Sequence, residues 1–125
     1  MTTLGSDPNV VVCYPETDRP EDIEAARKVY FSLQEDDSNW TWNVSWWSDP
    51  VLLGHYPEEG LERYEKYLPK ITEEDMRLIS EPIDIYGQNI YNGRCFRMGE
   101  DGKPQDVCRY EGFPKTAIQW PVTPE

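Results

Sequence analysis

The sequence is poor in the residues that build metal sites and disulfide frameworks. Its 125 residues include one histidine, His55, and three cysteines, Cys13, Cys95 and Cys108. Their spacing matches no zinc-binding pattern, so we expect no metal and no other cofactor. The opening "MTTLGSDPN" has no basic and apolar export signal, which makes the cytoplasm the default location and thiols the expected state. A Cys95–Cys108 bridge across a hairpin is the alternative.

Basic residues and long apolar runs are also scarce. The chain has 12 Lys and Arg against 24 Asp and Glu, a formal charge of −12. Affinity for nucleic acid or an anionic membrane depends on clustered basic side chains, so we expect neither partner. No apolar stretch approaches the ~20 residues that span a bilayer. The acidic excess is most simply a solvated surface.

What the sequence does contain is enough apolar material for one modest core, with 38% hydrophobic residues. The β-branched run "NVVVCY" at 9–14 is typical of a buried strand. A helix is predicted to follow from Pro20, which suits a first helical position. Apolar residues then recur at helical spacing, at Ile23, Ala26, Tyr30 and Leu33. A strand followed by an amphipathic helix is the start of a βα unit.

The rest of the chain alternates irregular and regular segments. We predict an irregular stretch over 34–60, helices over 60–68 and 72–80, a strand over 83–91, and a hairpin over 94–112. Thr72 and Asp75 have the spacing of a capping box. Two buried strands joined through helices imply a parallel pair, which cannot cover its own edges and faces. The chain therefore reads as a piece of something larger.

The order of motifs resembles glycoside hydrolase family 1, the β-glucosidase and 6-phospho-β-glucosidase family. The matching stretches are "YPETDRPEDIEAARK", "WWSDPVLLGHYPEEGLERYEKYLPKITEEDMRLI", "PIDIYGQNIYNG" and "PKTAIQWPVTPE". They cover nearly everything from Val10 to Glu125. The succession "D-P-x-x-x-G-x-Y-P", "L-P-K-x-T-E-E" and "D-x-x-G-x-N-x-Y" is specific in that order.

The resemblance implies an α/β fold that is part of a (β/α)8 TIM barrel, about strands five and six with their helices. It divides the chain into an atypical leader at 1–9, two βα units at 10–93, and a hairpin and substrate-cleft loop at 94–125. The departures from the family at both ends suggest a truncated gene, a split subunit or an excerpt.

The resemblance also implies three substrate-binding residues. Tyr91 would lie in the catalytic pocket with its hydroxyl on the nucleophilic carboxylate, and Asn89 would be a polar pocket residue beside it. Residues two apart on a strand share a face, and the carboxyl end of a barrel strand looks into the active site. Trp120 would form the platform for the leaving-group side of the substrate. Without the family, Tyr91 reads as a core or interface tyrosine, Asn89 as a turn residue and Trp120 as a surface cover.

The chemistry of the family needs two glutamates, an acid in an Asn-Glu-Pro motif and a nucleophile in a Thr-Glu-Asn-Gly motif. Neither motif occurs here. Local acids are poor substitutes, since Glu73, Glu74 and Asp75 read as a helix start and Glu16 and Asp18 have no carboxylate placed opposite them. We therefore expect no catalytic residue in this chain and no glycosidase activity from it alone.

Two functions remain to be compared. In the first, the chain is a segment of a retaining β-glucosidase that handles a β-glucoside or other small saccharide once the barrel is completed, by a complementing chain or by self-association. In the second, it stands alone and binds carbohydrate or protein through its tryptophan-rich loop, with Trp40, Trp42, Trp46 and Trp47.

Overall fold

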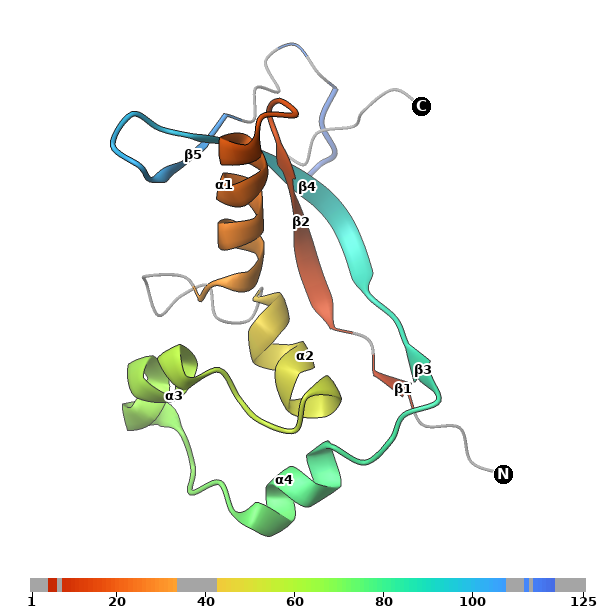
Figure 1. Ribbon diagram of the computed structural model, residues 1–125. Coiled ribbons are helices and arrows are strands. Elements are labelled where there is room, and N and C mark those ends of the chain that lie inside the picture. The colour runs from red at the N-terminus through yellow and green to blue at the C-terminus, as the bar shows by residue number, and fades with distance from the viewer. Residues whose placement is uncertain (1–4, 7, 34–42, 108–111, 113, 119–125) are drawn as a thin grey trace.

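The computed structural model describes residues 5, 6, 8–33, 43–107, 112 and 114–118 (Figure 1). Its elements are β1 (Gly5–Ser6), β2 (Asn9–Pro15), α1 (Pro20–Phe31), α2 (Val44–Leu52), α3 (Glu58–Tyr64), a 3-10 turn (Glu65–Tyr67), α4 (Glu73–Ile79), β3 (Ile85–Tyr86), β4 (Asn89–Met98) and β5 (Pro104–Asp106). The strands form a two-stranded sheet, β1–β3, and a three-stranded sheet in the order β2–β4–β5.

The predicted parallel pair is confirmed, because β2 and β4 are parallel neighbours. The predicted hairpin is also present, with β4 antiparallel to β5. The predicted strand over 83–91 is wrong in its bounds. Pairing stops at Tyr86, resumes at Asn89 and continues to Met98, so one strand carries both the expected strand end and the first arm of the hairpin. The length of β4 follows from its pairing with β2, which extends to Pro15, and not from the local sequence of β4.

Helix α1 packs on one face of the larger sheet. Its buried residues Ala25 and Ala26 form a core cluster with Phe96 of β4. The predicted apolar face is only partly right, since Ile23 is 48% exposed. Asp22 takes the inward position instead and is fully buried. The small side chains of the two alanines let the helix lie close to the strands, and the polar atoms of Asp22 are satisfied there by hydrogen bonds.

Helix α2 lies within the stretch that we predicted to be irregular, so that prediction is wrong for Val44–Leu52. Asn43 caps the helix, because its Oδ1 accepts a hydrogen bond of 2.8 Å from the backbone N–H of Trp46. Its Nδ2 donates to the backbone oxygen of Ser32 at 2.6 Å, which ties α2 to the end of α1. The cap was readable, but Pro50 inside the helix argued for a loop.

A second core cluster lies between α2 and α3 and consists of Leu33, Trp46 and Tyr64. Tyr56 packs on Trp46 with a ring-centroid distance of 4.7 Å. Helix α3 begins two residues before the predicted start, at Glu58. The predicted capping box of α4 is confirmed, with Thr72 and Asp75 bonding each other's backbone N–H groups.

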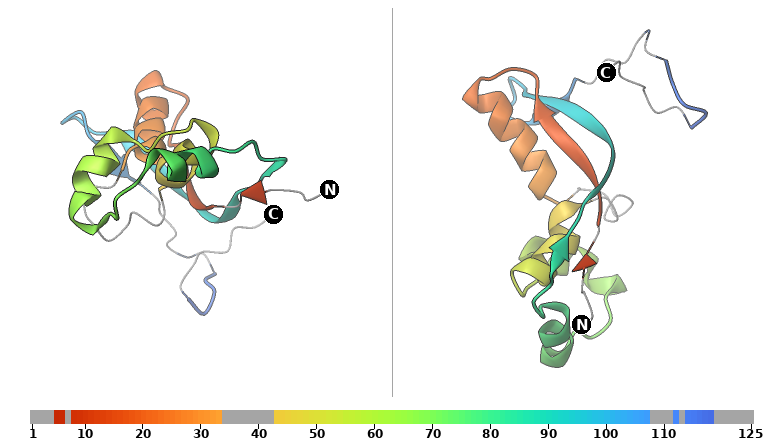
Figure 2. Two further views of the ribbon diagram at one scale, coloured as in Figure 1. Left: turned by 90° about the horizontal axis from the view of Figure 1, so that it is seen from below. Right: turned by 90° about the vertical axis from the view of Figure 1, so that its right-hand side faces the viewer.

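The views in Figure 2 show α1 on one face of the β2–β4 pair, with α3 and α4 toward the end where β1 and β3 lie. On the face opposite α1, Tyr14 of β2 is an exposed side chain. No helix among the described residues is long and apolar enough to cross a membrane.

Candidate functional site

Asn89 and Tyr91 lie side by side at the start of β4. Asn89 Nδ2 donates a hydrogen bond of 2.6 Å to the hydroxyl oxygen of Tyr91. This contact agrees with the expectation that residues two apart share a face. The expectation that they stand at the carboxyl end of a strand is wrong, since β4 continues seven residues beyond Tyr91, to Met98. They lie instead where the short β1–β3 pair gives way to the larger sheet.

The backbone at this junction is irregular. Val10 pairs with Ile90 and Val12 pairs with Gly93. Between these two pairs β4 has one residue more than β2. Tyr91 and Asn92 of β4 lie opposite the single residue Val11 of β2, an arrangement called a β-bulge. A bulge bends its strand and re-aims the side chain it carries. The change of register therefore falls at the residue that carries the candidate hydroxyl.

Two of the alternative readings, a core position for Tyr91 and a turn position for Asn89, are contradicted by the structure, while an interface role for Tyr91 stays open. Tyr91 is 58% exposed, so it is not a core tyrosine. Asn89 is the first residue of β4 and not a turn residue. Trp120, the third predicted site residue, lies outside the described residues, as do Trp40, Trp42 and Cys108. Cys13 and Cys95 are thiols.

Beyond the bulge, the larger sheet carries Tyr14 and Arg97, neither of which was predicted as a site residue. Tyr14 pairs with Cys95, and its ring lies over Gly93, where an added Cβ would be 3.1 Å from Tyr14 Cε1. Two residues further along each strand, Glu16 and Arg97 form an ion pair of 3.7 Å. Their period-two spacing on paired strands was visible in the sequence, but the register that aligns them was not.

The described carboxylates form no evident acid pair at this site. Glu16 is held by Arg97. Glu74 bonds Arg77 on the surface of α4, and Asp75 caps that helix. These contacts lower the pKa of Glu74 through its hydrogen bonds with Arg77, and that of Asp75 through its bonds with Thr72. All of these acids have structural partners.

Asp22 anchors the far end of the larger sheet to α1. Its carboxylate accepts hydrogen bonds from Thr17 Oγ1 at 2.6 Å, from the backbone N–H of Met98 at 3.0 Å, and from Arg19 Nη2 at 3.2 Å. The Thr17 hydroxyl and then the Met98 N–H hold the pKa of Asp22 below its usual value, against the opposing effect of burial. The charged form of Asp22 thus stabilises the end of β4.

One other carboxyl group has a shifted pKa. Burial raises the pKa of Asp49 in α2, and the nearby His55 opposes that shift. A raised carboxyl pKa in a cleft is a common feature of catalytic acids. No second described acid is placed with Asp49, so it supplies no acid pair.

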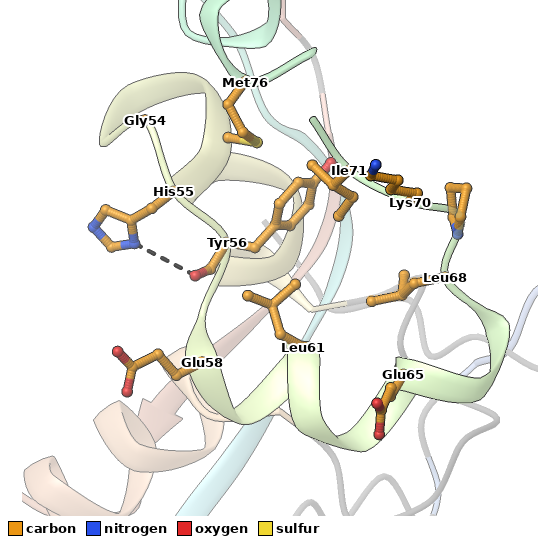
Figure 3. Close-up of a pocket in the computed structure, with 11 residues that line it drawn as sticks. Gly54, His55, Tyr56, Glu58, Leu61, Glu65, Leu68, Lys70, Ile71 and Met76 are labelled. Atoms are coloured by element: carbon orange, nitrogen blue, oxygen red, sulfur yellow. Dashed lines mark hydrogen bonds between the residues drawn. The ribbon is translucent and has the colours of Figure 1, made fainter. Parts of the chain in front are cut away.

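A pocket of about 680 Å³ lies between α3, α4 and the loop before α3 (Figure 3). Apolar side chains form much of its lining, among them Tyr56, Leu61 and Met76. Glu58 and Glu65 also line it, but their carboxylates point to different sides. None of its lining residues belongs to β2 or β4, so this pocket is separate from Asn89 and Tyr91.

Comparison with known proteins gives consistent matches over most of the chain. The family model described as Glycosyl hydrolase family 1 matches residues 3–123. The chain is 35% identical over 127 residues to Beta-glucosidase A of Acetivibrio thermocellus, covering 98% of this chain and 26% of the relative. It is 33% identical over 111 residues to a 1,4-beta-D-glucan glucohydrolase of Thermotoga neapolitana, covering 89% of this chain and 24% of the relative.

Solved structures agree. The family 1 β-glucosidase from Thermotoga maritima matches with a TM-score of 0.56 and 31% identity, covering 97% of this chain and 25% of that chain. The same enzyme in complex with glucoimidazole matches with a TM-score of 0.55 and 32% identity, covering 95% of this chain and 24% of that chain. The chain spans about a quarter of the length of these relatives.

Proposed function

Because the chain belongs to glycosyl hydrolase family 1, and its fold is a part of the α/β barrel of its β-glucosidase relatives, we propose that it is the central segment of a retaining β-glucosidase. In this proposal the chain forms one wall of the sugar site and the two catalytic glutamates come from other segments. The chain itself contains neither an Asn-Glu-Pro nor a Thr-Glu-Asn-Gly sequence.

The observation that carries the proposal is the hydrogen-bonded pair of Asn89 and Tyr91, exposed at a bulge. Retaining hydrolysis needs a carboxylate that attacks the anomeric carbon and a carboxylic acid that protonates the leaving oxygen, ~5 Å apart. The Tyr91 hydroxyl accepts from Asn89, and a phenol hydroxyl can also act as a donor. Donated to the nucleophile, its proton orients the attacking oxygen and favours its ionised form.

The partners follow from this role. The substrate class is a β-glucoside or other small saccharide, and the name of the Thermotoga neapolitana relative points to β-1,4-linked glucose. Trp120 is proposed as the platform under the leaving group, because a sugar ring presents an apolar face to an aromatic one. The barrel is completed by further sequence, by a complementing chain or by self-association. We place the reaction in the cytoplasm.

Trp46 does not fit the alternative function, a binding surface made of the four tryptophans; Trp40 and Trp42 lie outside the described residues. Trp46 is 4% exposed and belongs to the second core cluster, so it cannot join a binding surface. Its ring contacts Tyr64 at a centroid distance of 5.1 Å, edge to face. Trp47, the other described tryptophan of this set, is 40% exposed.

The proposal is tested with Tyr91→Phe in the complete barrel that contains this segment. Losing a hydrogen bond to a charged group costs about 1.5–3 kcal/mol, so kcat is expected to fall about 10- to 100-fold. The KM for a β-glucoside should change much less, because the lost contact acts on the nucleophile and not on the bound sugar. The measurement is steady-state kinetics on an aryl β-glucoside.

Tyr86→Phe is the matched control. Tyr86 belongs to the neighbouring strand β3, and its hydroxyl forms a hydrogen bond of 2.6 Å with Ser48 Oγ of α2. It should affect unfolding but leave kcat within about twofold, because its partner is structural. An unchanged kcat in Tyr91→Phe would remove Tyr91 from the catalytic pocket.

A further inference from the structure

A second hollow, of about 680 Å³, lies between the end of α1, helix α3 and the β4–β5 hairpin. Helix α1 contacts both β4 and β5, so the hollow lies between elements that pack together (Figure 1). Its volume falls within the ~300–1,000 Å³ of small-molecule sites. Four basic side chains from different parts of the fold line it, and we call it the basic hollow: Lys28 of α1, Arg63 of α3, Arg94 of β4 and Lys103 of the turn before β5.

The charge of the basic hollow is opposite to that of the chain. The chain has 24 acidic and 12 basic residues, whereas the described lining has four basic residues and two acidic ones, Glu59 and Asp106. The lining therefore has two positive charges in excess. A hollow lined mainly by one sign of charge concentrates the electrostatic field and attracts ions of the opposite sign.

The two arginines of the basic hollow are held by the two acids. Arg63 Nη2 forms an ion pair of 2.9 Å with Glu59, and its Nη1 donates a hydrogen bond of 2.9 Å to the backbone oxygen of Leu33. Arg94 forms an ion pair with Asp106. These pairs fix both guanidinium groups and compensate their charges, so the excess charge belongs to the two lysines.

Lys28 and Lys103 are exposed, and neither ammonium group forms an ion pair or a hydrogen bond with a described residue. Lys28 is in the last turn of α1, where a cation suits the negative end of the helix dipole. The dipole does not account for Lys103, which comes from the hairpin and lines the same hollow. Each ammonium group has three N–H donors.

We propose that the basic hollow is a binding site for a phosphate group, as the free ion or as the monoester of a small molecule. A phosphate monoester carries about −1.5 to −2 charges at neutral pH and has three strong acceptor oxygens. It therefore matches the charge and the donors of the two lysines, which a carboxylate with one charge and two oxygens does not. The site goes beyond the proposed function, since neither Asn89 nor Tyr91 is among its described lining residues.

The test is isothermal titration calorimetry on the complete barrel, at low ionic strength, with inorganic phosphate and with glycerol 3-phosphate. Lys28→Gln and Lys103→Gln should each raise the Kd about threefold to tenfold, because each removes a charged donor at an exposed site. Lys28→Arg keeps the charge and should stay within about threefold of the unaltered barrel. Tighter binding of the ester would identify a phosphorylated small molecule as the ligand, and equal binding would identify the free ion.

Lys70→Gln is the matched control, because Lys70 is an exposed lysine that lines the pocket between α3 and α4 instead. It should leave the Kd for phosphate unchanged. Malonate, a dicarboxylate of similar charge, should bind more weakly than phosphate.

Three results would overturn the site: no phosphate binding, equal affinity for malonate, or a Kd that does not respond to Lys28→Gln and Lys103→Gln. Binding of a poly-glutamate peptide that phosphate fails to displace would identify an acidic protein segment as the partner and would also overturn it. A barrel that hydrolyses β-glucosides but binds no phosphate would leave the proposed function intact, so the two failures are distinguishable.

Discussion

Gly60 is the residue on which the second core cluster depends most sharply. It lies in α3, directly against two buried side chains. A Cβ at this position would lie 2.6 Å from Trp46 Cζ3 and 2.7 Å from Leu33 Cδ1. Both contacts are too short for carbon atoms, and both neighbours belong to the same buried cluster. Glycine is therefore required here by close packing and not by backbone conformation.

Gly60→Ala is expected to destabilise the fold. Overpacking a core costs about 1–3 kcal/mol, whereas replacing Gly by Ala inside a helix gains at most ~1 kcal/mol. The clash should win, with a net loss on the order of 1–2 kcal/mol in the free energy of unfolding. Urea denaturation followed by tryptophan fluorescence measures it. Glu62→Ala, an exposed change in the same helix, is the control and should leave the free energy of unfolding nearly unchanged. If Gly60→Ala also leaves it unchanged, Trp46 can move aside and the packing argument is wrong.

At Asn89 and Tyr91 the contact between the two side chains followed from strand periodicity. The bulge that aims Tyr91 did not follow, because a bulge depends on the register against a strand about eighty residues earlier. The position of the Tyr14 ring did not follow from the sequence for the same reason. Its partner Gly93 is distant in sequence, and only the pairing of β2 with β4 puts the ring over it.

At the scale of elements, Asp22 connects α1 to the far end of β4. Its bond from the Met98 N–H joins residues 76 apart in the sequence. The same carboxylate accepts hydrogen bonds from the side chains of Thr17 and Arg19, in the loop that leads into α1. One side chain therefore holds the loop, the helix start and the strand end together, at the end of the sheet beyond Glu16 and Arg97.

Asp22→Asn should lower the free energy of unfolding at neutral pH. The amide of asparagine lacks the negative charge that strengthens the hydrogen bonds from Thr17, Met98 and Arg19. Its NH2 group also replaces an accepting oxygen with a donor, which cannot pair with those donors. Because the pKa of Asp22 is depressed in the folded state, its contribution is present above the unfolded pKa of about 3.9 and is lost as pH falls through the folded pKa. The difference between variant and wild type should therefore be full at neutral pH and shrink in acid.

Urea denaturation at neutral pH and again in acid, below the folded pKa, measures this. Asp18→Asn is the control, since Asp18 lies in the same loop, is exposed and undergoes the same change in charge. Its effect should be small at both pH values. A difference for Asp22→Asn that persists undiminished in acid would show that the loss is one of shape and not of charge.

The elements themselves were predictable to different degrees. The capping box of α4 and the β-branched run of β2 are local signals, and both led to the right elements. Helix α2 was hidden because Pro50 is a strong local signal against a helix, while the packing of Trp46 under Tyr64 that stabilises it is tertiary. Ile23 was placed inside by periodicity, but Asp22 occupies that position because its bonding partners come from β4.

At the scale of the whole molecule, two properties oppose each other. Large apolar side chains are exposed on both strands of the parallel pair, including Tyr14 on β2 and Ile90 on β4. No described strand lies on the outer side of β2. Such edges and faces promote association. The formal charge of −12 resists it by mutual repulsion.

The isolated chain is therefore expected to self-associate in a salt-dependent way. At low ionic strength the repulsion between copies acts over a longer distance, and at about 0.1 M salt the Debye length falls to ~10 Å, so added salt should strengthen association. Sedimentation velocity across protein and salt concentrations measures this. Ile90 of β4 is 50% exposed. Ile90→Lys puts a charge at this position and should shift the chain toward monomer. Leu78→Lys makes the same change on the exposed side of α4 and should have little effect if association proceeds through the sheet. A chain that stays monomeric at every salt concentration and unfolds cooperatively would be a self-sufficient domain, because its sheet would need no further strands to cover it.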